Sequence, residues 1–130
     1  MRKARSLVPG SVTLEDLAEL YWDSPAVALH ADTKPGIDAA AALIAGAAQG
    51  GEAVYGVNTG FGKLANTMIA PGDTLSLQRN LILSHCCGVG APLPERIVRL
   101  VMTLKLLSLG RGASGVRSQE VELLTAMLAA

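Results

Sequence analysis

The chain has 130 residues, and its 11 Lys and Arg balance 11 Asp and Glu, so it carries no net charge. The length fits one domain, and the charge balance does not indicate a nucleic-acid partner. Half of the residues are hydrophobic but only 3% are aromatic, which predicts an aliphatic core of packed helices and a surface covered by more chain or by other subunits. Because no signal peptide and no membrane-spanning segment are recognisable, we expect a cytoplasmic protein without a membrane partner.

The two cysteines, Cys86 and Cys87, are adjacent in the sequence. A disulfide between neighbouring residues is strained, so we expect reduced thiols. The pair also lacks the spacing with which two thiolates bind one metal ion. We therefore expect no metal site.

The first half of the chain predicts a helix, a weak strand and a longer helix. Thr13 with an acid at position 16 is typical of an N-cap and opens a helix to about Tyr21, after a tail that ends at Pro9-Gly10. Alternating apolar residues at 26–30 give a weak strand signal. The alanine-rich segment 38–48 favours helix, and a short extended segment at 53–55 follows.

The second half predicts helices at 75–85, 94–109 and 118–130. Asp73 is a candidate N-cap, and Pro94 suits a first helical position. Most of the helix at 94–109 is apolar, so its polar face is expected to be a narrow wet strip on a helix buried in a large bundle. That face carries Arg96, Arg99 and Thr103. The last helix has no stop signal, so the chain is expected to end within an element.

The most distinctive segment is Tyr-Gly-Val-Asn-Thr-Gly-Phe-Gly at positions 55–62. Its glycines allow an irregular loop that directs neighbouring side chains, and such loops often carry catalytic groups. The same composition also fits an ordinary surface turn with a half-buried tyrosine. A second glycine pattern at 110–115 satisfies GxGxxG but follows a helix, so it is not a dinucleotide site.

Three segments together resemble the N-terminal part of the aromatic amino acid ammonia-lyases. They are the tyrosine segment 55–62, the segment 77–85 that ends in Ser-His, and Arg-Gly-Ala-Ser-Gly-Val-Arg at 111–117. The resemblance covers nearly the whole chain and implies a mainly α, fumarase/aspartase-like fold with minor short strands and a glycine-rich active-site loop. Residues 1–130 would then be the N-terminal part of a longer ammonia-lyase domain.

The Ser84-His85 pair is most similar to family members that act on histidine. The resemblance therefore implies a carbon–nitrogen lyase that eliminates ammonia from L-histidine to give urocanate, as a homotetramer. Tyr55 matches the base that removes a proton from the substrate β-carbon. Because a free phenol has a pKa of about 10, such a base needs nearby cations or helix N-termini. Ser84, His85, Gly62 and Asn58 are the expected substrate-binding residues.

The family uses a methylidene-imidazolone (MIO) group, which forms from an internal Ala-Ser-Gly. Ala113-Ser114-Gly115 spells this tripeptide, but Val116-Arg117 follows it where the family continues with Asp-Leu-Ala-Pro. We expect this copy to be structural, the true precursor to lie beyond Ala130, and the chain alone to be inactive. Two alternatives stay open: a tyrosine or phenylalanine ammonia-lyase or aminomutase, and a non-catalytic helical module for binding or assembly.

Overall fold

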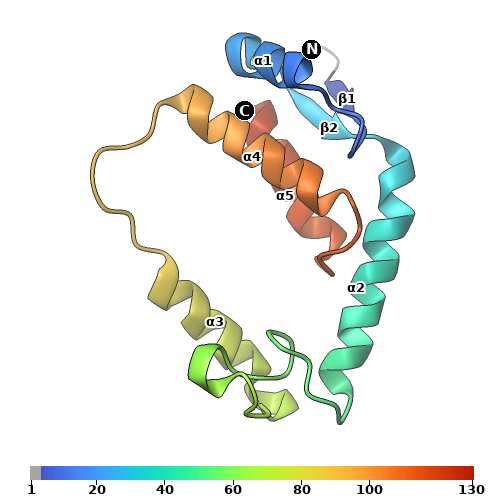
Figure 1. Ribbon diagram of the computed structural model, residues 1–130, viewed down its shortest axis with the longest axis vertical. Coiled ribbons are helices and arrows are strands. Elements are labelled where there is room, and N and C mark those ends of the chain that lie inside the picture. The colour runs from blue at the N-terminus through green and yellow to red at the C-terminus, as the bar shows by residue number, and fades with distance from the viewer. Residues whose placement is uncertain (1–3) are drawn as a thin grey trace. The chain divides into compact units, whose positions relative to one another are not determined.

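The computed structural model describes residues 4–130 and is mainly helical, as predicted. Figure 1 shows five α-helices and two short strands among these residues: β1 (Arg5–Leu7), α1 (Leu14–Asp23), β2 (Val27–Leu29), α2 (Lys34–Gln49), α3 (Thr74–His85), α4 (Glu95–Leu109) and α5 (Ser118–Ala129). Single 3-10 turns lie at Ala31–Thr33, Gly62–Leu64 and Pro71–Asp73. The chain divides into a larger unit, described for residues 4–42 and 92–130, and a smaller unit, Leu43–Ala91.

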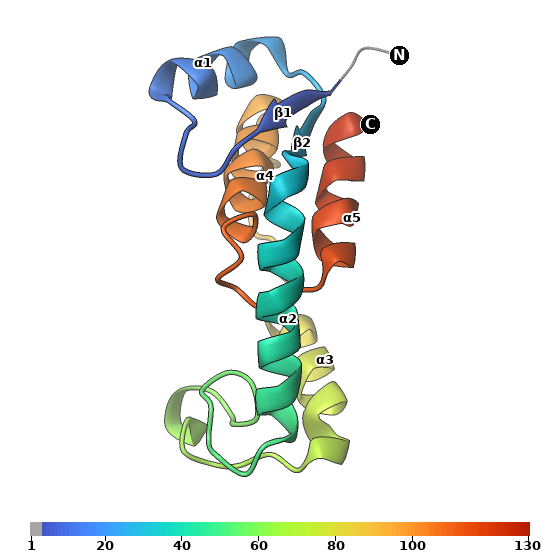
Figure 2. The ribbon, with the colours of Figure 1, turned by 90° about the vertical axis from the view of Figure 1, so that its right-hand side faces the viewer.

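The core of the larger unit lies where the two strands meet α1, α4 and α5. β1 and β2 pair in parallel, with Arg5 opposite Val27 and Leu7 opposite Leu29. α4 and α5 pack against each other and against β2 (Figure 2). The buried side chains that form this core are Leu7, Leu20, Val27, Leu106 and Leu128. The prediction of a tail before Pro9 was therefore wrong, because a three-residue strand is too short to show a periodicity in the sequence.

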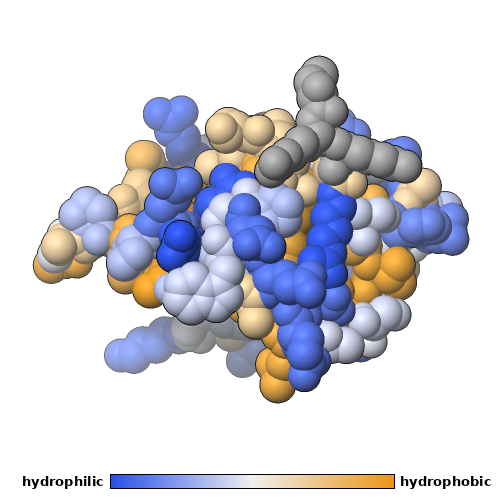
Figure 3. Space-filling model, turned by 90° about the horizontal axis from the view of Figure 1, so that it is seen from above, coloured by the Kyte–Doolittle hydropathy of each residue, from blue (hydrophilic) through white to orange (hydrophobic). Residues whose placement is uncertain are grey.

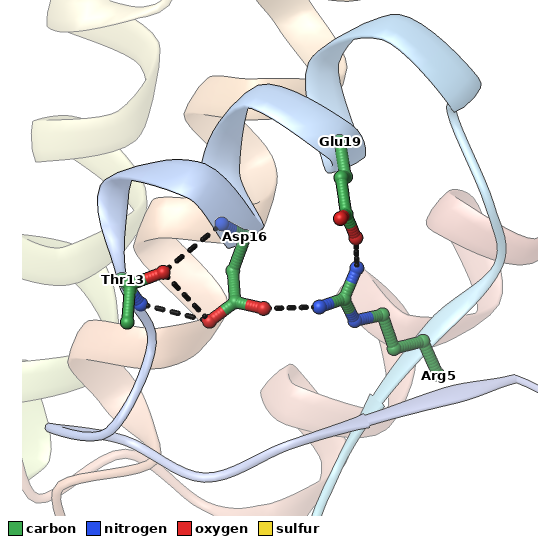
Figure 4. A network of polar contacts seen from close by, with 4 residues as sticks. All are labelled: Arg5, Thr13, Asp16 and Glu19. Atoms are coloured by element: carbon green, nitrogen blue, oxygen red, sulfur yellow. Dashed lines mark hydrogen bonds and ion pairs between the residues drawn. The ribbon is translucent and has the colours of Figure 1, made fainter.

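The predicted N-cap of α1 is confirmed. The Oγ1 of Thr13 accepts a hydrogen bond from the backbone N–H of Asp16 at 3.1 Å, and the Asp16 carboxylate accepts one from the backbone N–H of Thr13 at 2.9 Å. Arg5 of β1 forms ion pairs with Asp16 and Glu19, as Figure 4 shows. The hydrogen bonds from Thr13, and then the Arg5 charge, lower the pKa of Asp16. The helix ends at Ser24, which has a φ of 45°.

The polar face of α4 is turned inward, so the prediction of a wet strip at Arg99 and Thr103 was wrong. Thr103 is buried and donates to the carbonyl of Arg99 at 2.8 Å. The Arg99 guanidinium donates to the carbonyl of Leu128 at 2.6 Å and to those of Ser24 and Pro25 at 3.4 Å. Carbonyl groups at helix ends lack intrahelical donors, and Arg99 supplies donors at the ends of α1 and α5. The apolar residues that face outward instead are Ile97, Val98, Val101 and Leu104.

Several element boundaries differ from the prediction. α2 begins at Lys34 rather than at 38, and a hydrogen-bonded group joins its first turns to α5. In this group, Lys34 donates to the Oγ of Ser118 at 3.0 Å, and Ser118 donates to Asp38 at 2.5 Å. The expected extended segment at 53–55 leads into a turn instead. Asp73 stands at the cap position of α3, but its side chain makes no capping hydrogen bond.

Apolar side chains reach the surface of the larger unit. Figure 3 shows hydrophobic residues in orange among hydrophilic ones on the face seen from above. Leu14 is 79% exposed and Trp22 is 63% exposed. None of the helices described within residues 4–130 has both the length and the apolarity to cross a membrane.

Candidate active site

The tyrosine segment forms a closed loop in the smaller unit, between the end of α2 and the start of α3 (Figure 1). The backbone N–H groups of Val57 and Asn58 donate to the carbonyl of Val54 at 3.0 and 3.2 Å. Thr59 pairs with Met68 in an antiparallel bridge. The loop is therefore fixed by its own hydrogen bonds at both ends of the turn.

Asn58 lies at the centre of this loop and is 1% exposed. Its Oδ1 accepts from the backbone N–H of Val54 at 2.7 Å. Its Nδ2 donates to the carbonyl of Glu52 at 2.8 Å and lies 3.2 and 3.4 Å from those of Ala47 and Gly50. The side-chain amide thus joins the turn to the C-terminal end of α2.

Tyr55 projects from this turn and is 65% exposed. Its ring meets the ring of Phe61 edge to face, with 6.0 Å between the centroids. Gly56 follows it with a φ of +75°, in the region that favours glycine. The phenol is therefore held on an ordered turn without being enclosed by apolar side chains, and can meet a substrate.

Gly62 and Gly60 have different local roles in the loop. Gly62 has a φ of +57°, and a Cβ built on it would meet no atom within 4 Å. The space in front of it is open, as a position beside a bound ring requires. At Gly60 an added Cβ would lie 2.5 Å from the Cβ of Leu64. Sequence reasoning did not identify this close approach, because the spacing of glycines does not show which one is tightly packed.

Ser84 and His85 stand together on the last turn of α3. Both reach back to the carbonyl of Leu81, with the Ser84 Oγ at 3.0 Å and the His85 Nδ1 at 2.9 Å. A carbonyl oxygen can only accept, so this contact assigns a proton to Nδ1 of His85. In the neutral ring, Nε2 is then the acceptor, and the exposed side chain can offer it to a ligand N–H.

The structure places the predicted residues in two local groups. Tyr55, Asn58 and Gly62 share the loop, while Ser84 and His85 share the end of α3, a helix about 18 Å long by its 12 residues. In the described residues, the side-chain hydrogen bonds of Ser84 and His85 stay within α3. A cavity of about 420 Å³ lies elsewhere, in the larger unit between β2, the start of α2 and α5.

The tripeptide Ala113-Ser114-Gly115 lies in the connection between α4 and α5, and its alanine and serine are exposed. Gly112, just before it, packs so closely on α2 that an added Cβ would lie 2.7 Å from the backbone carbon of Gly36. A reactive electrophile needs a site that excludes water. Residues 113–115 therefore do not fit the precursor of the family's MIO group.

Comparison with known proteins agrees with this geometry. Residues 12–130 match the model of the family described as aromatic amino acid lyase. Histidine ammonia-lyases of Bartonella quintana and Bartonella henselae are each 60% identical over 123 residues, which is 95% of this chain and 24% of theirs. The chain thus spans about a quarter of the length of these curated relatives.

Solved structures also match nearly the whole chain. Tyrosine aminomutase from Streptomyces globisporus superposes with a TM-score of 0.88 and 26% identity over 98% of this chain and 24% of its own. The ergothionase of Treponema denticola superposes with a TM-score of 0.89 and 25% identity over 98% of this chain and 26% of its own. The chain belongs to the aromatic amino acid lyase family.

Proposed function

We propose that this chain is the N-terminal part of a histidine ammonia-lyase, which eliminates ammonia from L-histidine to give urocanate. The observation that carries the proposal is the exposed phenol of Tyr55 on a loop that is otherwise tied down by hydrogen bonds. The 60% identity to the Bartonella histidine ammonia-lyases supports histidine as the substrate.

The elimination requires loss of a proton from the β-carbon and of the amine from the α-carbon. The electron pair of the C–H bond becomes the new Cα–Cβ double bond, and the C–N pair leaves with ammonia. In this proposal Tyr55 acts as its phenolate and takes the β-proton. A base of this kind contributes about 10²- to 10⁴-fold to the rate when it lies within hydrogen-bonding reach of that proton.

We assign the substrate imidazole to His85. With Nδ1 protonated toward Leu81, its Nε2 accepts a hydrogen bond from the N–H of the substrate ring. Ser84 holds the same carbonyl and borders the His85 ring at 3.0 Å. Gly62 leaves room for the substrate ring, because no atom lies where a Cβ would stand.

The MIO group supplies the electrophile that activates the amine in this family. Since residues 113–115 do not fit its precursor, we propose that another segment of the enzyme provides it and that this chain is inactive alone. The same reading makes the whole enzyme a cytoplasmic homotetramer.

A chimera tests the substrate. In it, this chain replaces the part of the Bartonella quintana relative that it matches, so that any activity depends on the residues described above. We expect urocanate from L-histidine and no elimination product from L-tyrosine or L-phenylalanine. The His85→Phe variant should lose histidine turnover mainly through a raised KM. Turnover of tyrosine or phenylalanine in preference to histidine would contradict the proposal.

A further inference from the structure

Asn58 stands three residues after Tyr55 and has no side-chain N–H left for a substrate. Its amide carries two N–H groups. One donates to the carbonyl of Glu52 at 2.8 Å, and the other lies between those of Ala47 and Gly50 at 3.2 and 3.4 Å. Because the side chain is also 1% exposed, a ligand cannot reach it without opening the loop.

The same amide determines the path of the backbone around Tyr55. Val54, the residue before it, donates its N–H to the Asn58 Oδ1 at 2.7 Å and accepts from the Asn58 N–H at 3.2 Å. Tyr55 thus lies inside a five-residue turn that Asn58 closes twice. The Nδ2 contacts then join this turn to the end of α2, whose last carbonyls lack intrahelical donors.

We propose that Asn58 is a positioning residue, which sets the direction of the Tyr55 phenol by anchoring its turn to α2. The inference rests on the proposed function and replaces the expected substrate-binding role of Asn58. A misplacement of about 1 Å in a reacting group can cost on the order of 10²-fold in rate. The Tyr55 ring has one aromatic neighbour, Phe61, and depends on its backbone for direction.

The substitution Asn58→Asp isolates the anchoring. Aspartate keeps the shape and the acceptor for Val54 but has no N–H for the carbonyls at the end of α2. Asn66→Asp makes the same chemical change at an exposed asparagine of the same loop and is the matched control. The milder pair Asn58→Ser and Asn66→Ser gives a second comparison should the aspartate variant not fold.

The measurement is steady-state turnover of L-histidine by the chimera, with each variant made in the unaltered and in the Tyr55→Phe background. We expect the Asn58 variants to lower kcat by about 10- to 100-fold with KM within about threefold, and the Asn66 variants to leave both unchanged. In the Tyr55→Phe background the Asn58 substitutions should cause no further loss, because a residue that acts only through the phenol has nothing left to position.

The outcomes separate the two proposals. A raised KM with unchanged kcat would restore the substrate-binding role, and an equal loss in both backgrounds would show a general structural role, so either result overturns the positioning role alone. A chimera that turns over no histidine overturns the proposed function and, with it, this inference. The predicted pattern of kcat loss confined to the tyrosine background supports both.

Discussion

The close contact between Gly112 and α2 yields a prediction whose size can be worked out from the structure. Gly112 has a φ of +66°, and a Cβ added there would lie 2.7 Å from the carbon and 2.8 Å from the oxygen of Gly36. Gly112→Ala therefore forces a left-handed backbone on a residue with a Cβ, at about 1–2 kcal/mol, and overpacks a rigid backbone contact, at about 1–3 kcal/mol. We expect a loss of about 2–5 kcal/mol in the free energy of unfolding.

Gly10→Ala is the matched control, because Gly10 has a φ of +86° with nothing within 4 Å of an added Cβ. It should show the conformational cost alone, about 1–2 kcal/mol. Urea unfolding of the chain, followed by the fluorescence of its single tryptophan, Trp22, measures both. With a slope of about 2 kcal/mol/M, the midpoint should fall by about 1–2.5 M for Gly112→Ala and by about 0.5–1 M for the control. Equal shifts would refute the close approach and reopen the placement of residues 113–115.

Three further predictions concern single side chains. The hydrogen bonds from Thr13 lower the pKa of Asp16 from its ordinary 3.8, so the stability lost in Asp16→Asn should be full above that pH and shrink as pH falls through the lowered pKa; a pH-independent difference in thermal unfolding would contradict this. Arg99→Met should cost about 1–3 kcal/mol in urea unfolding, because buried carbonyl groups lose their donor, and no loss would remove its role as a helix-end donor. Nitrogen NMR of the neutral His85 ring should show the proton on Nδ1, as the Leu81 carbonyl requires; a proton on Nε2 alone would contradict the assigned role in binding imidazole.

Helix positions could be predicted from the sequence because their signals are local. The Thr13 capping box and the alanine-rich segment ending at Gln49 each predict an element through neighbouring residues. The orientation of α4 could not be predicted in the same way. Arg99 faces inward because it pairs with carbonyls more than 25 residues away along the chain, and periodicity places a charged residue outside by default.

The candidate site divides along the same line. Tyr55 and His85 were singled out by resemblance, and the structure places the first on an ordered loop and the second at a helix end. The partners of Asn58 could not be read from its neighbours, because they include the end of α2, 11 residues earlier. A buried amide is recognisable only once the backbone groups that it satisfies are in place.

The most direct test of the account is the kcat of the chimera with Tyr55→Phe, measured by urocanate formation from L-histidine. Removing the hydroxyl of an exposed ring leaves the hydrogen bonds of the loop intact, so the variant should remain folded. We predict a loss of about 10²- to 10⁴-fold in kcat with KM nearly unchanged. Turnover within threefold of the unaltered chimera would show that the phenol does not take the β-proton.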